Sequence, residues 1–133
     1  MRGENTISIQ DGKQRLAFTI RKMEPLRLEQ WFTRAVGLMV KEEDAAEEAY
    51  YEAGKKLAEG GIWKLAALPD PEAARDLGDQ LLGCCSRVLD NMEIACTPEN
   101  VNGFVQEVST LFTLKNAALK SNLDFLLRED SVQ

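Results

Sequence analysis

The stretch at residues 97–127 constrains the fold more than any other part of the chain. Its apolar residues recur three or four positions apart, the period at which side chains line one face of an α-helix. Thr97 is a favourable N-cap, and Pro98 suits the first helical position, where its missing N–H group costs nothing. A continuous helix of about 30 residues would be about 45 Å long, longer than a domain of this size is usually wide. We therefore expect one long C-terminal helix against which shorter elements pack. Its apolar positions are Val101, Phe104, Val105, Val108, Leu111, Phe112, Leu119, Leu123 and Leu126.

The size and charge of the chain exclude several classes of protein. With 133 residues, of which 44% are hydrophobic and 29% charged, we expect a single domain over residues 1–133. The net charge of −6 repels phosphates, so nucleic acid is not an expected partner. No apolar run approaches the roughly 20 residues of a membrane span, and the charged first residues do not form a signal peptide. We expect a cytoplasmic protein with no membrane contact.

The histidine and cysteine content argues against an enzyme. The chain has no histidine, which removes the usual general base, the usual zinc partner of cysteine and every Ser–His or Cys–His pair. Cys84 and Cys85 are adjacent, Cys96 is alone, and no Cys-x-x-Cys spacing occurs. We expect three reduced thiols that act as small hydrophobic side chains. No catalytic residue, cofactor or metal site is predicted.

Residues 5–23 have the pattern of a β-hairpin. Apolar and polar residues alternate on both sides of Asp11-Gly12, a dipeptide typical of type I′ turns. A two-residue loop there pairs Ile7 with Leu16, and the apolar side chains of both strands then share a face. Residues 91–96 alternate in the same way and are a candidate third strand. Two strands alone are marginally stable, so we expect this face to pack against helices.

Four shorter helical segments are expected between the hairpin and the long helix. Pro25 opens the first, Gly60-Gly61 end the second, and Asp70-Pro71 form the N-cap and first position of the fourth. The predicted fold is α+β and predominantly helical, with the hairpin packed on four to five helices. The helical body covers residues 25–127, and a polar, frayed tail covers residues 128–133. The expected shorter helices lie at residues 25–39, 45–58, 62–68 and 70–89.

The densest charge cluster is acidic. It lies between the first and second predicted helices, and two interpretations are open for it: a solvated face or a docking patch for a basic partner. A metal site is disfavoured, because the segment lacks the glycine and the alternating oxygen ligands of a calcium loop. The cluster consists of Glu42, Glu43, Asp44, Glu47 and Glu48.

Four blocks follow one another along the chain. They read FTIRKMEPLRLEQWFTRAVGLM at residues 18–39, Gly60-Gly61-Ile62-Trp63, LGDQLLGCCSRV at residues 77–88, and TLFTLKNAALKSNLDFLL at residues 110–127. In this order they resemble the tail assembly chaperones of long-tailed bacteriophages and related prophages. The resemblance implies a non-enzymatic protein of the bacterial host cytoplasm. Such a protein binds the long, apolar, helical tape-measure protein, keeps it soluble and helps to recruit tail-tube subunits.

Two alternative functions belong to other classes. A structural head–tail or tail adaptor would remain in the virion and would be detected in purified particles. A small thiol-dependent enzyme would need Cys84 or Cys85 exposed with a low pKa.

The predicted partner-binding residues lie at the end of the long helix. That helix has more apolar positions than one face needs, and Phe125 widens its apolar seam to one side. The seam consists of Val101, Val105, Val108, Phe112, Leu119, Leu123 and Leu126. We expect Phe125, Leu126 and Leu127 to be partly exposed and to hold the helix of the tape-measure protein or a second copy of the chain. If these residues are core instead, the acidic cluster is the next candidate for the contact.

Overall fold

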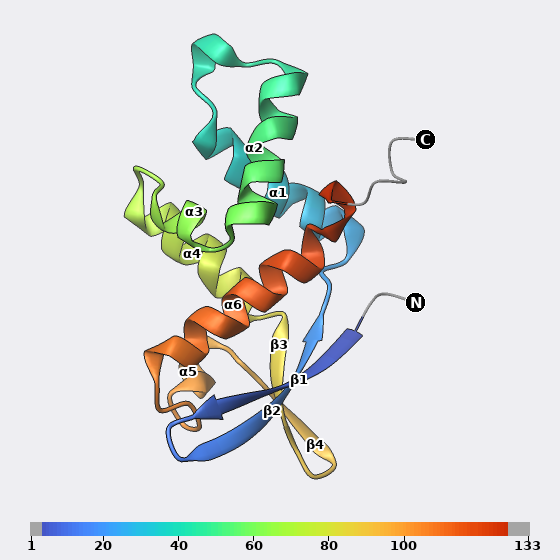
Figure 1. Ribbon diagram of the computed structural model, residues 1–133, viewed down its shortest axis with the longest axis vertical. Coiled ribbons are helices and arrows are strands. Elements are labelled where there is room, and N and C mark those ends of the chain that lie inside the picture. The colour runs from blue at the N-terminus through green and yellow to red at the C-terminus, as the bar shows by residue number, and fades with distance from the viewer. Residues whose placement is uncertain (1–3, 128–133) are drawn as a thin grey trace.

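A four-stranded antiparallel sheet forms one end of the molecule, and most of the helices form the other (Figure 1). This computed structural model describes residues 4–127, and the predicted frayed tail at residues 128–133 lies outside them. The strands are adjacent in chain order, and the arrangement confirms the predicted α+β class. They are β1 (Glu4–Asp11), β2 (Gln14–Arg21), β3 (Cys85–Leu89) and β4 (Met92–Ala95).

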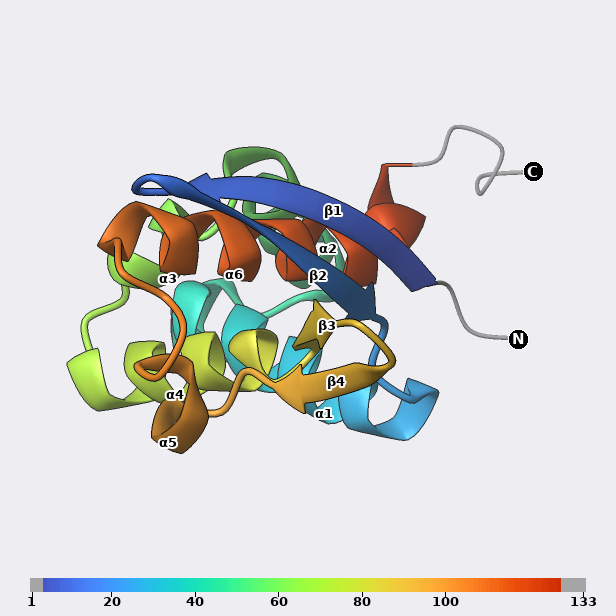
Figure 2. The same cartoon turned by 90° about the horizontal axis from the view of Figure 1, so that it is seen from below.

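The helix α6 crosses the molecule between the sheet and the helices α1 to α4 (Figure 1). Viewed from below, β1 and β2 run along one side of α6, and α4 and α1 lie on the opposite side (Figure 2). The helical elements are α1 (Pro25–Met39), the 3₁₀ turn η1 (Glu42–Asp44), α2 (Glu47–Gly60), α3 (Trp63–Ala66), α4 (Pro71–Leu82), α5 (Pro98–Val101), α6 (Val108–Asn122) and the 3₁₀ turn η2 (Asp124–Leu126).

The N-terminal hairpin forms as predicted, but its register differs by two residues. The loop is Gly12-Lys13, and Ile7 pairs with Phe18 instead of Leu16. Because the shift is even, the apolar side chains of both strands still share one face. Gly12 has a φ of 64°, and among the described residues Lys13 has no such positive angle, as expected for a type II′ turn rather than type I′.

The helix predicted at residues 70–89 is wrong in its second half. Asp70 caps α4 as expected, since its carboxylate accepts hydrogen bonds from two backbone N–H groups of the first turn. The helix ends at Leu82, however, and β3 begins at Cys85. Residues 85–88 pair with β2 and so complete the sheet, which overrides the helical spacing of the apolar residues. The predicted third strand is confirmed as β4, and β3 is an additional strand.

The continuous helix predicted at residues 97–127 is also wrong. Thr97 caps only the one-turn helix α5, and an irregular segment separates it from α6. The break has a long-range cause: the buried carboxylate of Asp11 accepts hydrogen bonds from the backbone N–H groups of Gln106 (2.8 Å) and Glu107 (2.9 Å). Those N–H groups therefore cannot continue a helix from α5, and α6 starts anew at Val108.

The core lies between the sheet and the helices, with α6 through its middle. The largest fully buried side chains include Trp31 of α1, Phe18 of β2 and Leu57 of α2. Within α6, the buried apolar residues are Leu114, Ala118 and Leu119. Two residues of the predicted apolar seam, Val108 and Phe112, instead face outward and are exposed.

Candidate partner-binding surface

Two large aromatic side chains lie exposed against each other where α3 meets α6. Trp63 is 63% exposed and Phe112 is 37% exposed. Their ring centroids are 5.1 Å apart, with an angle of 50° between the rings. Val108, one helical turn before Phe112, is 64% exposed. We call these three residues the Trp63 patch. A cluster of exposed apolar side chains is typical of an interaction surface, whereas single exposed ones are common on any protein.

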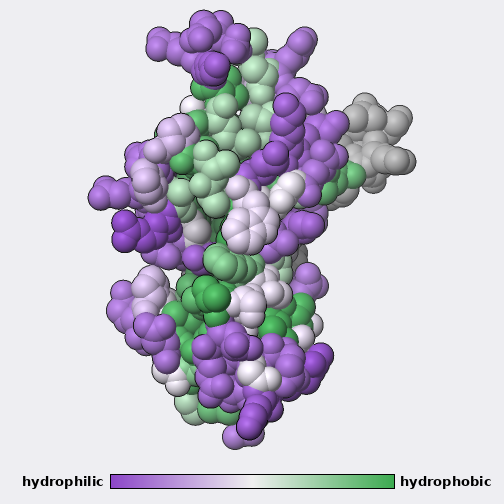
Figure 3. Space-filling model, turned by 60° about the vertical axis from the view of Figure 1, so that its left-hand side comes forward, coloured by the Kyte–Doolittle hydropathy of each residue, from purple (hydrophilic) through white to green (hydrophobic). Residues whose placement is uncertain are grey.

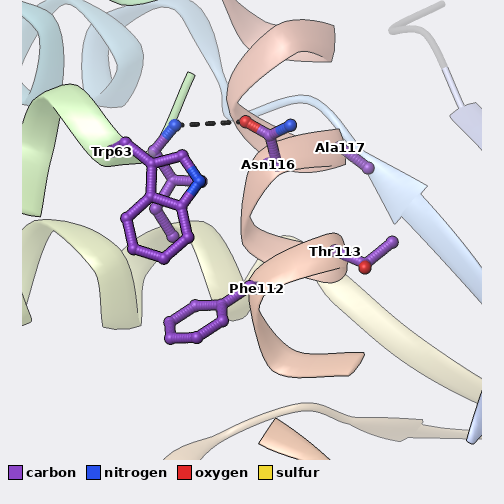
Figure 4. Close-up of a pocket in the computed structure, with 6 residues that line it drawn as sticks. Trp63, Phe112, Thr113, Asn116 and Ala117 are labelled. Carbon is purple, nitrogen blue, oxygen red and sulfur yellow. Dashed lines mark hydrogen bonds between the residues drawn. The ribbon is translucent and has the colours of Figure 1, made fainter. Parts of the chain in front are cut away.

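A hollow of about 350 Å³ lies beside the aromatic pair. Figure 4 shows Trp63 from α3 and Phe112 from α6 facing one another, with Asn116 one turn further along α6. The lining combines the two rings and Ile62 with the polar residues Thr113 and Asn116. An aromatic-lined hollow with a few polar groups is suited to an apolar side chain on a partner's backbone.

The junction between α2 and α3 fixes the direction in which Trp63 points. Gly61, which follows the last residue of α2, has a φ of 78° and lies directly against Asn116. The next residue, Ile62, is buried and donates its backbone N–H to Oδ1 of Asn116 (3.1 Å). Leu65 is also buried, so the one-turn helix α3 is held by Ile62 and Leu65, and Trp63 between them faces outward.

On the face that carries α3 and α6, hydrophobic and hydrophilic residues occupy different areas. In Figure 3, hydrophobic and near-neutral residues run along the centre of this face, from just below its upper tip to the level where α6 crosses. Hydrophilic residues flank them and cover the upper tip and most of the lower end.

The predicted C-terminal partner-binding residues are mostly packed into the molecule. Leu126 is only 4% exposed, so the expectation that it is partly exposed is wrong. Phe125 is half-buried, with its ring in edge contact with Phe32 at a centroid distance of 5.9 Å. Leu127 is 45% exposed, as expected. η2 packs against α2, and Phe125 contacts Phe32 of α1, which explains the burial. A role of these residues in partner binding stays a prediction.

The acidic cluster lies at the tip of the molecule away from the sheet, around η1 and the start of α2 (Figure 1). All five carboxylates, Glu42, Glu43, Asp44, Glu47 and Glu48, are exposed. Tyr51 on the next turn of α2 is also exposed and lines a shallow hollow with Glu47, Glu48 and Glu52. Both interpretations, solvated face and docking patch for a basic partner, fit this placement.

The three cysteines are free thiols in an environment that disfavours the thiolate. Cys85 and Cys96 are buried and Cys84 is half-buried. Burial raises the pKa of all three, to about 11 for Cys96 and well above its ordinary value for Cys85, where the neighbouring Cys96 and Cys84 add to the effect. The thiolate is the reactive form, so a thiol-dependent enzyme gains no support from this geometry.

Within residues 4–127, no three side chains of metal-ligating type come together as a metal site would require. Among the helices described, none combines the length and the apolar character needed to cross a membrane.

Comparison with known proteins gives no match. No protein family matches the chain, and neither a curated protein nor a solved structure is similar to it.

The Trp63 patch could be predicted only in part from the sequence. Phe112 fits the helical period of the apolar seam, and this period predicts that it is buried in the core. Trp63 belongs to the block Gly60-Gly61-Ile62-Trp63, and Phe112 belongs to the block at residues 110–127. Both residues therefore lie in segments that carry the resemblance. The contact between them, however, depends on the packing of α3 against α6.

Proposed function

We propose that the chain is a non-enzymatic tail assembly chaperone of a long-tailed phage or prophage, acting in the host cytoplasm. It binds the apolar, helical tape-measure protein, keeps it soluble and helps to recruit tail-tube subunits. One observation carries the proposal: the exposed Trp63–Phe112 pair lies where two of the four blocks that resemble this family meet in space.

The physical properties of the Trp63 patch fit such a client. An amphipathic helix presents apolar side chains every three or four residues, and it is commonly bound through a few anchors in an apolar groove. Tryptophan is enriched among the residues that dominate binding energy at protein interfaces. The net charge of −6 makes copies of the chain repel one another, which opposes co-aggregation with an insoluble client.

The test is co-expression with a tape-measure protein of a long-tailed phage, followed by affinity purification and measurement of the soluble fraction. We expect the wild-type chain to retain the tape-measure protein in solution. Trp63→Ala and Phe112→Ala are each expected to weaken binding by about 10- to 100-fold, the effect of removing about 1.4–2.8 kcal/mol of interface energy. Both side chains are exposed, so the melting temperature should change little.

Leu26→Ala is the matched control. Leu26 is 67% exposed near the start of α1 and is not part of the Trp63 patch, so its truncation should leave binding unchanged. Equal loss of binding in all three variants, or no loss in any, would contradict the proposal. Detection of the chain in purified particles would favour the structural adaptor instead, and addition of tail-tube protein to the purified complex tests the recruitment step.

A further inference from the structure

Arg87 is a charged residue on the core side of the sheet. It pairs with Phe18 of β2 on one side and with Ile94 of β4 on the other. Residues directly opposite each other share a face of a sheet, and Phe18 is fully buried in the core. The guanidinium of Arg87 therefore points to the side of the sheet that carries the core.

The guanidinium has no counter-ion within residues 4–127. Its Nε atom is buried and makes no hydrogen bond, and none of the ion pairs formed by the described residues involves Arg87. Its contact is with the ring of Phe104, whose centroid lies 5.6 Å from the guanidinium carbon. A buried N–H group without an acceptor is rare in folded proteins and calls for an explanation such as a ligand.

A pocket of about 290 Å³ lies at this guanidinium. Besides Arg87 and Phe104, it is lined by Gln14 of β2 and by the irregular segment between α5 and α6. Gln14 is already engaged, because its side-chain amide donates to Asp11 and to the backbone carbonyl of Phe104. Arg87 is thus the cationic group of the pocket and carries hydrogen-bond donors that the described chain leaves unused.

We propose that this pocket binds a single carboxylate, supplied by an acidic side chain of a partner polypeptide. The planar guanidinium offers paired N–H donors that match the two oxygens of a carboxylate. The site is built from residues other than those of the Trp63 patch and does not depend on the chaperone function.

The surrounding charges favour a carboxylate over a phosphate. The carboxylate of Asp11 lies behind the pocket wall, where it accepts from Gln14 and from the backbone N–H of Gln106. It would repel a dianion more strongly than a monoanion. It also occupies backbone N–H groups of the loop, which a phosphate would otherwise use.

The neighbouring residues indicate that the carboxylate comes from a polypeptide. Leu89 and Met92 oppose each other two pairs further along the β3–β4 hairpin, and therefore lie on the same face as Arg87. Leu89 is 41% exposed and Met92 is 61% exposed. An acidic side chain in the pocket would place an adjacent apolar residue of its chain on this uncovered surface.

The test observes the Nε–Hε group of each arginine by NMR during titration with acetate, at an ionic strength held constant with sodium chloride. We expect the Arg87 signal to shift and saturate in the millimolar range. Arg21 is an internal control, since its guanidinium is already paired with Glu4 and Glu93, and its signal should not move. Absence of a saturable shift, or an equal response to chloride or phosphate, would overturn the proposal.

Two further measurements test the role of Arg87 and the source of the carboxylate. Acetate should raise the melting temperature of the wild-type chain and not that of Arg87→Lys, which keeps the charge but lacks the paired donors. The capped dipeptide acetyl-Leu-Glu-amide should half-saturate at a concentration about three- to tenfold lower than acetate, because its leucine covers apolar surface. If the dipeptide and acetate half-saturate the pocket at the same concentration, the pocket binds small free carboxylates, and the proposal that a polypeptide supplies the carboxylate is wrong.

Discussion

At the scale of single residues, Asp11 connects two parts of the chain that are 95 residues apart. The pKa of its carboxyl is lowered from 3.8 to about 2. Burial alone would raise this pKa, and hydrogen bonds from Gln106, Thr110, Gln14 and Glu107 outweigh that effect. The turn chemistry of Asp11-Gly12 is visible in the sequence. The capping role is not, because no local pattern relates Asp11 to the start of α6.

The lowered pKa of Asp11 predicts the sign of a pH effect. A carboxylate with a folded-state pKa below its unfolded-state value stabilises the protein above about pH 4, and this stabilisation is lost as the pH falls toward about 2. Asp11→Asn should lower the free energy of unfolding at pH 7 by about 1–3 kcal/mol and reduce its dependence on pH in this acid range. Chemical denaturation between pH 7 and pH 2 measures both. Asp44→Asn, at an exposed position, is the control and should change the free energy by less than about 0.5 kcal/mol at pH 7.

The cysteines allow a second prediction at this scale. Cys84 is half-buried, whereas Cys85 and Cys96 are buried and oppose each other where β3 meets β4. In a reaction with a thiol-specific reagent at pH 8, Cys84 should react first, and the other two only after local opening of the sheet. Cys84→Ala should remove the fast phase and leave partner binding intact. Loss of binding in that variant, with an unchanged circular dichroism spectrum, would contradict the non-enzymatic interpretation.

At the scale of elements, the sequence predicts local features well and long-range ones poorly. The starts of α1 and α4 and the end of α2 follow from Pro25, Asp70-Pro71 and Gly60-Gly61, which act through their own backbone geometry. The strand β3 has helical apolar spacing, and only its pairing with β2 makes it a strand. The break before α6 likewise depends on the distant residue Asp11.

The junction of α2, α3 and α6 gives a prediction about one glycine. A Cβ atom on Gly61 would lie 2.4 Å from Oδ1 of Asn116, at a φ of 78° that L-residues rarely adopt. Gly61→Ala should therefore lower the free energy of unfolding by about 1–3 kcal/mol and displace Ile62 from Asn116. It should also weaken partner binding, because Trp63 is aligned through this contact.

Gly37→Ala is the matched control for Gly61→Ala. Gly37 lies within α1, and a Cβ there would meet nothing within 4 Å. The same substitution should stabilise the protein by about 0.5–1 kcal/mol, since alanine favours the helix more than glycine does. Chemical denaturation compares the two, and equal effects at both positions would contradict the account of the junction.

At the scale of the whole molecule, α6 is held at both ends by the start of the chain. Asp11 fixes its N-terminal end. At its C-terminal end, Asn122 accepts the backbone N–H of Met23 (2.8 Å), and Lys22 forms an ion pair with Asp124 (2.9 Å). The C-terminal region therefore lies at the centre of the fold, as predicted, although not as one continuous helix. Its division into α5, α6 and η2 follows from contacts that the pattern does not contain.

The C-terminal turn η2 gives the last prediction, because it joins the end of α6 to the helical end of the molecule. Leu126 is buried, and Phe125 packs on Phe32. Phe125→Asp with Leu126→Ser should lower the free energy of unfolding by more than about 3 kcal/mol, since it removes two packed side chains and buries polar groups in their place. Leu127→Ser changes an exposed side chain and should shift that free energy by less than about 0.5 kcal/mol. If the double variant is as stable as the wild type and fails only in partner binding, the flank is a docking surface and its packing role is wrong. If Leu127→Ser alone weakens binding of the tape-measure protein, the contact extends from the Trp63 patch to this end of α6.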